Sequence, residues 1–91
     1  MTVADRIREK LTAKLAPTRL DVIDDSHAHA GHVGARPEGE THFSVEVVSA
    51  AFDGMSRVNR QRLVYDILQE ELAGPVHALA LRTLSPSEDA A

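Results

Sequence analysis

Histidine is the residue type in this sequence whose number and spacing most clearly offer chemistry. Four of the five histidines, His27, His29, His32 and His42, fall within sixteen positions, and the fifth is His77. Neutral imidazole is a common metal ligand, and imidazoles on a loop can adapt to the geometry that a metal requires. The spacing alone is weak evidence, because a solvated loop can be rich in histidine without binding a metal.

His77 opens the last strand that the sequence predicts. Its simplest role is that of a histidine held by backbone hydrogen bonds at the end of a core strand. If that strand end lies near the loop histidines, His77 and one of them can bind a metal centre from two sides of a cleft. Two imidazoles do not hold an ion or a cluster tightly, so a partner would complete the ligand set. The sequence has no Cys, and any thiolate ligand must therefore come from another molecule.

A basic stretch offers a second kind of chemistry. Arg57, Asn59, Arg60 and Arg62 lie in the first half of the second predicted helix, where they could face phosphate groups. The formal net charge of −4 repels nucleic acid as a whole, which favours a solvated helix face instead. We find no nucleophile elbow, phosphate-binding loop or dinucleotide fingerprint, so we expect no enzymatic activity.

Five elements are predicted to position these groups, in the order helix, strand, strand, helix, strand. Periodicity and turn residues place them at residues 3–15, 19–24, 42–49, 56–73 and 76–84. The last strand is almost entirely apolar through residue 81, which predicts shielding on both of its faces. Residues 25–41 are predicted to form a long loop, and residues 85–91 a flexible tail after one domain at 1–84.

The predicted fold belongs to the α+β class. A strand, helix and strand in succession form a right-handed crossover, which makes the second and third strands parallel. Two helices then cover one face of a three-stranded mixed sheet, and the other face stays open to a partner. No stretch reaches the roughly 20 apolar residues of a membrane span, and the first residues lack the apolar run of a signal peptide. We therefore expect a cytoplasmic protein without membrane contact, monomeric or weakly dimeric when alone.

Residues 40–83 closely resemble the BolA family. The likeness is strongest in THF at 41–43, in the F-x-G of residues 52–54, in NRQRLVY at 59–65 and in EELxxPVHALAL at 70–81. It extends more weakly through the first helix and covers nearly the whole chain. The resemblance implies a class II KH-like fold, with the same order of elements as the periodicity predicts.

The resemblance also implies a metal site that is shared with a partner. Members of the family pair with monothiol glutaredoxins, and a bridging [2Fe–2S] cluster is held by glutaredoxin and glutathione thiolates together with ligands from the BolA side. One of the ligands from the BolA side is the histidine that matches His77. The other comes from the loop between the first two strands. Without Cys, this chain resembles the histidine type. His29 is the best match for the loop ligand, with His27 and His32 as alternatives.

The function implied is that of an adaptor in iron–sulfur cluster trafficking or in iron or redox signalling. Some relatives are instead linked to transcription regulation and DNA binding through the KH-like fold. A DNA-binding regulator that uses the basic stretch of the second helix is therefore the alternative function.

Overall fold

The computed structural model describes residues 2–25 and 41–90, so the predicted ligands His27, His29 and His32 lie outside the described residues. The described chain forms a sheet with the strand order β1-β2-β3. Its strands are β1 (Arg19–Asp24), β2 (His42–Val48) and β3 (Ala78–Leu84). The pair β1–β2 is antiparallel and the pair β2–β3 is parallel, which confirms the predicted mixed sheet.

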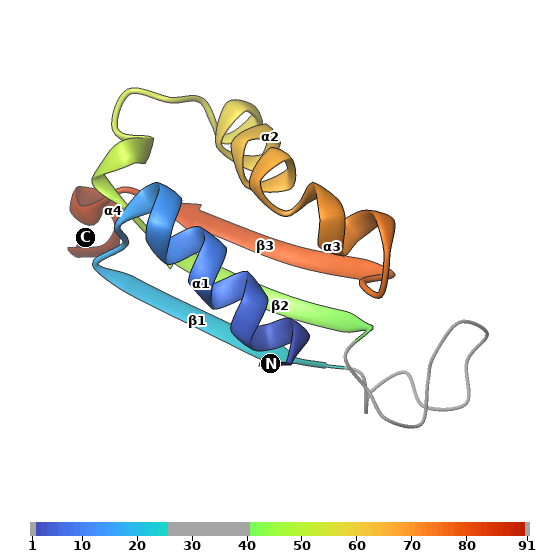
Figure 1. Cartoon of the computed structure of the whole chain (residues 1–91). Helices are drawn as coiled ribbons and strands as arrows, with labels where there is room; N and C mark the ends of the chain where they lie inside the picture. Colours follow the sequence, from blue (N-terminus) through green and yellow to red (C-terminus); the bar gives the residue numbers. More distant parts are fainter. Residues whose placement is uncertain (1, 26–40, 91) are drawn as a thin grey trace.

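Helices cover one face of this sheet. They are α1 (Val3–Leu15), α2 (Arg57–Ile67) and α3 (Gln69–Ala73), while α4 (Pro86–Ala90) follows β3 and a 3₁₀ turn spans Ala50–Phe52. Figure 1 shows α1 and α2 on the same side of the sheet, and their apolar residues join those of the strands in one core. Among the described residues, no helix has the length and apolar character needed to cross a membrane.

Local sequence accounts for the start of α1 and for its buried face. Thr2 and Asp5 form a capping box, in which each side chain accepts a hydrogen bond from the backbone amide of the other. Ile7, Leu11 and Leu15 recur at every fourth position and are buried against the sheet. The observed bounds of α1 are those that the sequence predicts.

The side chains of β2 alternate between the two faces of the sheet. Phe43, Val45 and Val47 are buried under the helices, whereas Ser44 and Glu46 are only partly buried on the opposite face. One face of β2 therefore contributes to the core, and the other contributes to an open sheet surface.

The shielding predicted for the last strand is wrong on one face. Leu79 and Leu81 pack against the core, but Ala78 and Ala80 on the other face are exposed. Alanine is small enough to be tolerated on a solvated face, so an apolar run that contains it does not require burial there. The strand also begins at Ala78, two residues later than predicted.

The single helix predicted for residues 56–73 is two helices in the structure. Ser56 caps α2 by accepting a hydrogen bond from the Asn59 amide, and α2 ends at Ile67. Leu68, with φ of −100° and ψ of 17°, separates it from α3. The break keeps Leu68 in the core at 1% exposure, while α3 turns toward α1.

The tail that the sequence predicts at residues 85–91 contains the short helix α4. Glu88 Oε1 lies 2.6 Å from Arg60 Nη1, and Asp89 Oδ1 lies 2.6 Å from Arg19 Nη2. Both arginines are distant in sequence, so no local pattern around α4 indicates these ion pairs. The two ion pairs hold the C-terminal end of the chain against α2 and β1.

Acid should release α4. Hydrogen bonds from Arg60 and from the Ser85 amide lower the pKa of Glu88 to about 2, against 4.5 for a free glutamate. A lowered folded-state pKa means that this contribution is complete above about pH 4.5 and is lost as the pH falls toward 2. We expect α4 to detach over that range, and Glu88→Gln to detach it already at pH 7.

The measurement is backbone ¹⁵N relaxation at residues 87–90. Detachment would appear as fast local motion at these residues while β3 stays rigid. The control is Glu9→Gln. Glu9 is also an exposed glutamate but lies on α1, so this change should leave the relaxation of residues 87–90 unchanged. Rigid residues 87–90 in Glu88→Gln at pH 7 would show that the ion pair does not hold α4.

Candidate functional site

Two histidines meet where β2 and β3 begin. Because these strands are parallel, they start at the same edge of the sheet, and His42 lies opposite Ala78 in their register. His77 immediately precedes Ala78. The ring centroids of His42 and His77 are 6.3 Å apart with an interplanar angle of 13°, so the two imidazoles are stacked.

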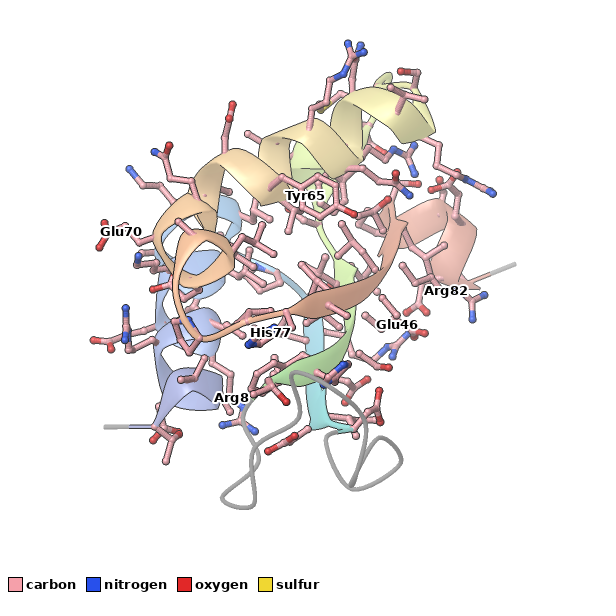
Figure 2. All side chains as sticks on the ribbon, turned by 90° about the vertical axis from the view of Figure 1, so that its right-hand side faces the viewer. Arg8, Glu46, Tyr65, Glu70, His77 and Arg82 are labelled. Atoms are coloured by element: carbon pink, nitrogen blue, oxygen red, sulfur yellow. The ribbon has the colours of Figure 1, made fainter. Side chains whose placement is uncertain are left out.

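The backbone of His77 is fixed although its side chain is exposed. Its amide donates to the Thr41 carbonyl at 2.7 Å, and the preceding Val76 is buried at 4% exposure, with its amide bound to the Glu71 carbonyl. Within residues 2–25 and 41–90, no hydrogen bond to the His77 ring is found. Backbone bonds thus hold the residue at the strand edge, and its side chain, labelled in Figure 2, is exposed.

Asp25 and Thr41, the described residues on either side of the segment with the other histidines, lie at this same edge. The Asp25 amide donates to the His42 carbonyl at 2.7 Å, and Thr41 binds the His77 amide. The side-chain hydroxyl of Thr41 also lies 2.8 Å from Nδ1 of His42. Residues 26–40 therefore leave and rejoin the described chain beside the two stacked imidazoles.

The stacked pair is an incomplete ligand set. Among the described residues, no three or more His, Asp or Glu side chains are arranged to hold a metal ion. Exposed imidazole nitrogen can act as a ligand, but further donors are required for tight binding. The edge can thus contribute to a metal centre that other donors complete.

The sequence did not predict that His42 belongs to this site. It counts among the clustered histidines of the sequence, but the predicted ligands are His77 and the loop histidines. The signal was present, since parallel pairing brings the first residues of both strands to one edge. The register that stacks His42 on His77 is known only from the structure.

The predicted nucleic-acid residues divide into two groups. Arg57, Asn59 and Arg62 are exposed on α2, as phosphate contact requires. Arg60 is buried at 8% exposure and shares the inner face of α2 with Val64, one turn later. The spacing of charges in the sequence does not separate the two groups.

Arg60 makes several hydrogen bonds within the protein. Its Nε donates to the Met55 carbonyl at 3.0 Å, and its Nη1 donates to the Thr83 carbonyl at 3.3 Å and to Glu88. The guanidinium also lies 5.8 Å from the centroid of the Phe52 ring. Arg60 therefore joins α2, β3 and α4, and its predicted role as a phosphate ligand does not fit this position.

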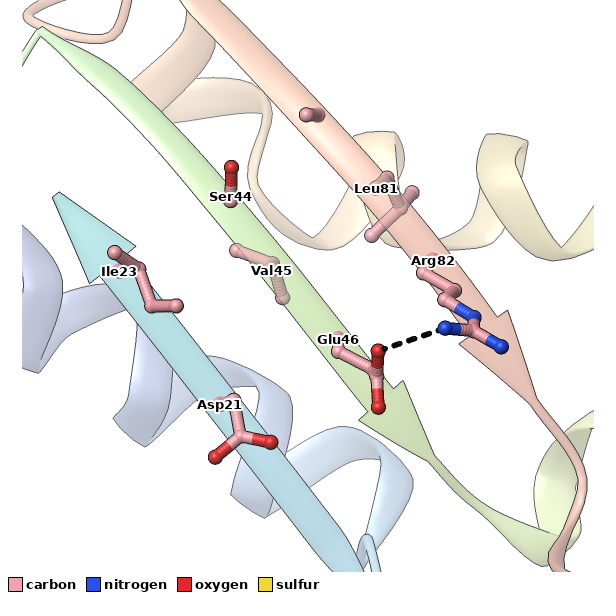
Figure 3. Close-up of a pocket in the computed structure, with 8 residues that line it drawn as sticks. Asp21, Ile23, Ser44, Val45, Glu46, Leu81 and Arg82 are labelled. Atoms are coloured by element: carbon pink, nitrogen blue, oxygen red, sulfur yellow. Dashed lines mark hydrogen bonds and ion pairs between the residues drawn. The ribbon is translucent and has the colours of Figure 1, made fainter. Parts of the chain in front are cut away.

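The open face of the sheet has a shallow cavity of about 320 Å³. Figure 3 shows its charged side chains on all three strands, with Glu46 bound to Arg82 at 3.4 Å. Glu46 also pairs with Arg19, which binds Asp21 at 2.7 Å. The charges of Asp21, Arg19 and Glu46 largely satisfy one another, so this face is a weaker candidate for ligand chemistry than the histidine edge.

Known proteins resemble the chain over nearly its whole length. The family model described as "BolA-like protein" matches residues 11–88. "DNA-binding transcriptional regulator BolA" of Escherichia coli is 43% identical over 88 residues, which cover 97% of this chain and 80% of that protein. "Protein BOLA1, chloroplastic" of Arabidopsis thaliana is 49% identical over 87 residues, which cover 93% of this chain. The match covers 54% of that plant protein.

A solved structure shows the same fold. The "BolA domain of SufE1 from Arabidopsis thaliana" superposes with a TM-score of 0.84 at 49% identity, and 93% of each chain is covered. The agreement includes the three-stranded mixed sheet and its helices. Sequence, fold and family model thus identify the same set of relatives.

Proposed function

We propose that this chain, which belongs to the BolA-like family, is a non-enzymatic adaptor that pairs with a monothiol glutaredoxin. It would supply histidine ligands to a [2Fe–2S] cluster shared with glutaredoxin and glutathione, in cluster trafficking or in iron or redox signalling. The matched relatives are named as a regulator or as BolA proteins rather than as enzymes.

The exposed imidazole of His77, beside Asp25 and Thr41 at the sheet edge, is the observation that carries the proposal. Its backbone is fixed by the bond to Thr41, so the residue already lies at the strand edge before any partner arrives. We propose His29 as the second ligand, with His27 and His32 as alternatives. A chain extends at most about 3.6 Å per residue, so His29 lies no more than about 15 Å from Asp25.

The ligand chemistry of the edge suits a shared cluster. The chain has no Cys, and its histidines would leave sulfur donors to the partner. Histidine in place of thiolate removes negative charge from a bound cluster and raises its reduction potential. His77 and the second histidine would bind the cluster and orient it. The backbone bonds at Thr41 and Asp25 would keep the two sides of the site together.

Reconstitution tests this function directly. The chain is mixed with a monothiol glutaredoxin, glutathione, ferrous iron and sulfide without oxygen, and the product is analysed by gel filtration and visible circular dichroism. We expect a one-to-one heterodimer whose spectrum differs from that of the glutaredoxin homodimer, because imidazole replaces thiolate. A spectrum identical to that of the homodimer would rule the ligand role out.

DNA binding is the second candidate, and two observations favour it. The relative in Escherichia coli is named a DNA-binding transcriptional regulator, and Arg57, Asn59 and Arg62 are exposed on α2. Retention on duplex DNA that falls steeply with salt, and is lost in Arg57→Glu/Arg62→Glu, would support this function. Arg60 is left unchanged in this test because it is buried.

We also propose a cytoplasmic location, and a monomer or a weak homodimer in the absence of glutaredoxin. Family members are not confined to one compartment, since one plant relative is named chloroplastic. Cell fractionation and sedimentation of the isolated chain address these two points.

A further inference from the structure

β3 is an edge strand, and its backbone has a defined free side. In the order β1-β2-β3, β2 is its one neighbour among the described strands. The Leu84 carbonyl accepts a hydrogen bond from the Ser49 amide on the β2 side. The Thr83 carbonyl accepts instead from Arg60 Nη1, on the side of α2. Odd-numbered residues of β3 therefore direct their backbone groups away from β2.

The same alternation applies to the residues before Thr83. In an extended strand, the amide and carbonyl of every second residue point to the same side. Leu79 and Leu81 thus direct both groups outward with Thr83, and the arginine that reaches this side bonds to the Thr83 carbonyl alone. An edge of this kind is a template for pairing with another extended chain.

A groove runs along this free edge. It has a volume of about 490 Å³ and is lined by Arg57 and Gln61 of α2 and by residues 81–84 of β3. Ligand sites commonly have volumes of about 300–1,000 Å³. Arg57, Gln61 and Tyr65 follow one another at intervals of four residues and so form one stripe of α2. Tyr65, 40% exposed, lies between α2 and β3 in Figure 2.

The groove is cationic although the protein is acidic. No carboxylate is among its lining residues. Within the described chain, Arg57 has no ion pair. Arg82, whose side chain is 70% exposed, has one ion pair, to Glu46 at 3.4 Å. The formal net charge of the whole chain is −4, so this positive site is a local feature.

We propose that an extended, acidic peptide segment of a partner protein adds to β3 as a fourth strand in this groove. Its backbone pairs with Leu79 and Leu81, and its carboxylates face Arg57 on the helix side and Arg82 on the open face. A strand edge offers alternating donors and acceptors, which match a peptide backbone and not a phosphate chain. The groove is lined by residues 81–84, whereas His77 precedes the first residue of β3, so the groove is distinct from the histidine edge.

Amide exchange of the isolated chain tests the pairing. The probe is the acetylated and amidated octapeptide VEEVEEVE, and exchange is followed residue by residue by NMR. We expect the amides of Leu79 and Leu81 to exchange about tenfold more slowly when the peptide is bound. The amides of Ala80 and Arg82 already face β2 and serve as references within the same strand. Binding that leaves the Leu79 and Leu81 amides unprotected overturns strand addition.

Two control peptides and a matched variant sharpen the test. The same sequence with every backbone nitrogen methylated, and the cationic peptide VKKVKKVK, should both fail to bind. Arg57→Glu should weaken binding of VEEVEEVE about fivefold, whereas Arg62→Glu, the same charge change on α2 outside the groove, should change it less than about twofold. Equal losses in the two variants overturn the proposed site. Displacement of the peptide by an oligonucleotide at lower concentration assigns the groove to nucleic acid and overturns the proposal as well.

Discussion

Replacing His77 by alanine is expected to abolish the altered visible spectrum of the glutaredoxin heterodimer without unfolding the protein. The imidazole is exposed, and the bonds that hold this residue come from its backbone amide, which alanine retains. The free energy of unfolding should change by less than about 0.5 kcal/mol, as for other surface substitutions. Visible circular dichroism of the reconstituted complex and urea unfolding of the isolated chain measure the two effects.

Two companion variants give this result its meaning. His42→Phe keeps a ring stacked on His77 but removes the imidazole nitrogens, and it should retain the altered spectrum. If it does not, His42 is itself a ligand. His29→Ala should weaken the spectrum unless His27 or His32 takes its place. If His77→Ala unfolds the isolated chain, the role of His77 is structural, and the proposed ligand set fails.

Glu71→Gln should produce the largest loss of stability among single charge substitutions. Glu71 is fully buried on α3, with its side chain 1% exposed. Its Oε2 lies 2.9 Å from Arg6 Nη2 and 2.9 Å from Lys10 Nζ, so two cations of α1 converge on it. Removing one partner of a buried ion pair typically costs about 3–5 kcal/mol. Arg6 and Lys10 are partly solvated, which reduces the expected cost to about 2–3 kcal/mol.

This loss is measurable by urea unfolding at pH 7, because small domains have only about 5–15 kcal/mol of stability. The matched control is Glu70→Gln, the preceding residue in the chain. Its side chain is 76% exposed and lies 3.6 Å from Lys10, so the change should cost less than about 0.5 kcal/mol. Similar losses for Glu70→Gln and Glu71→Gln would show that burial of the Glu71 pair is not what stabilises the packing of α1 on α3.

The pH dependence of the Glu71 effect has a definite sign. Burial raises the pKa of Glu71, but hydrogen bonding and ion pairing with Lys10 and Arg6 outweigh it and bring the pKa below its usual value. A lowered pKa in the folded state gives stability that is present at neutral pH and lost in acid. The difference between the wild-type protein and Glu71→Gln should therefore shrink as the pH falls below about 4.5.

Several features of the fold were determined by the sequence itself. Periodicity and turn residues predicted α1 at its observed bounds and β2 to within one residue. The right-handed strand-helix-strand connection predicted the parallel β2–β3 pair. These predictions succeed because they depend on periodicity and chirality, which act over a few residues or within one connection.

Only the tertiary structure decided which side chains meet. His42 and His77 are stacked because of the register of two strands, and Arg60 turns inward because Thr83 and Glu88 come to it from 23 and 28 residues away. The docking of α4 and the free edge of β3 have the same origin. Such contacts depend on where distant segments lie after the core has formed, and residue types along the chain do not contain that geometry. Local periodicity thus predicts the elements, whereas packing determines the site.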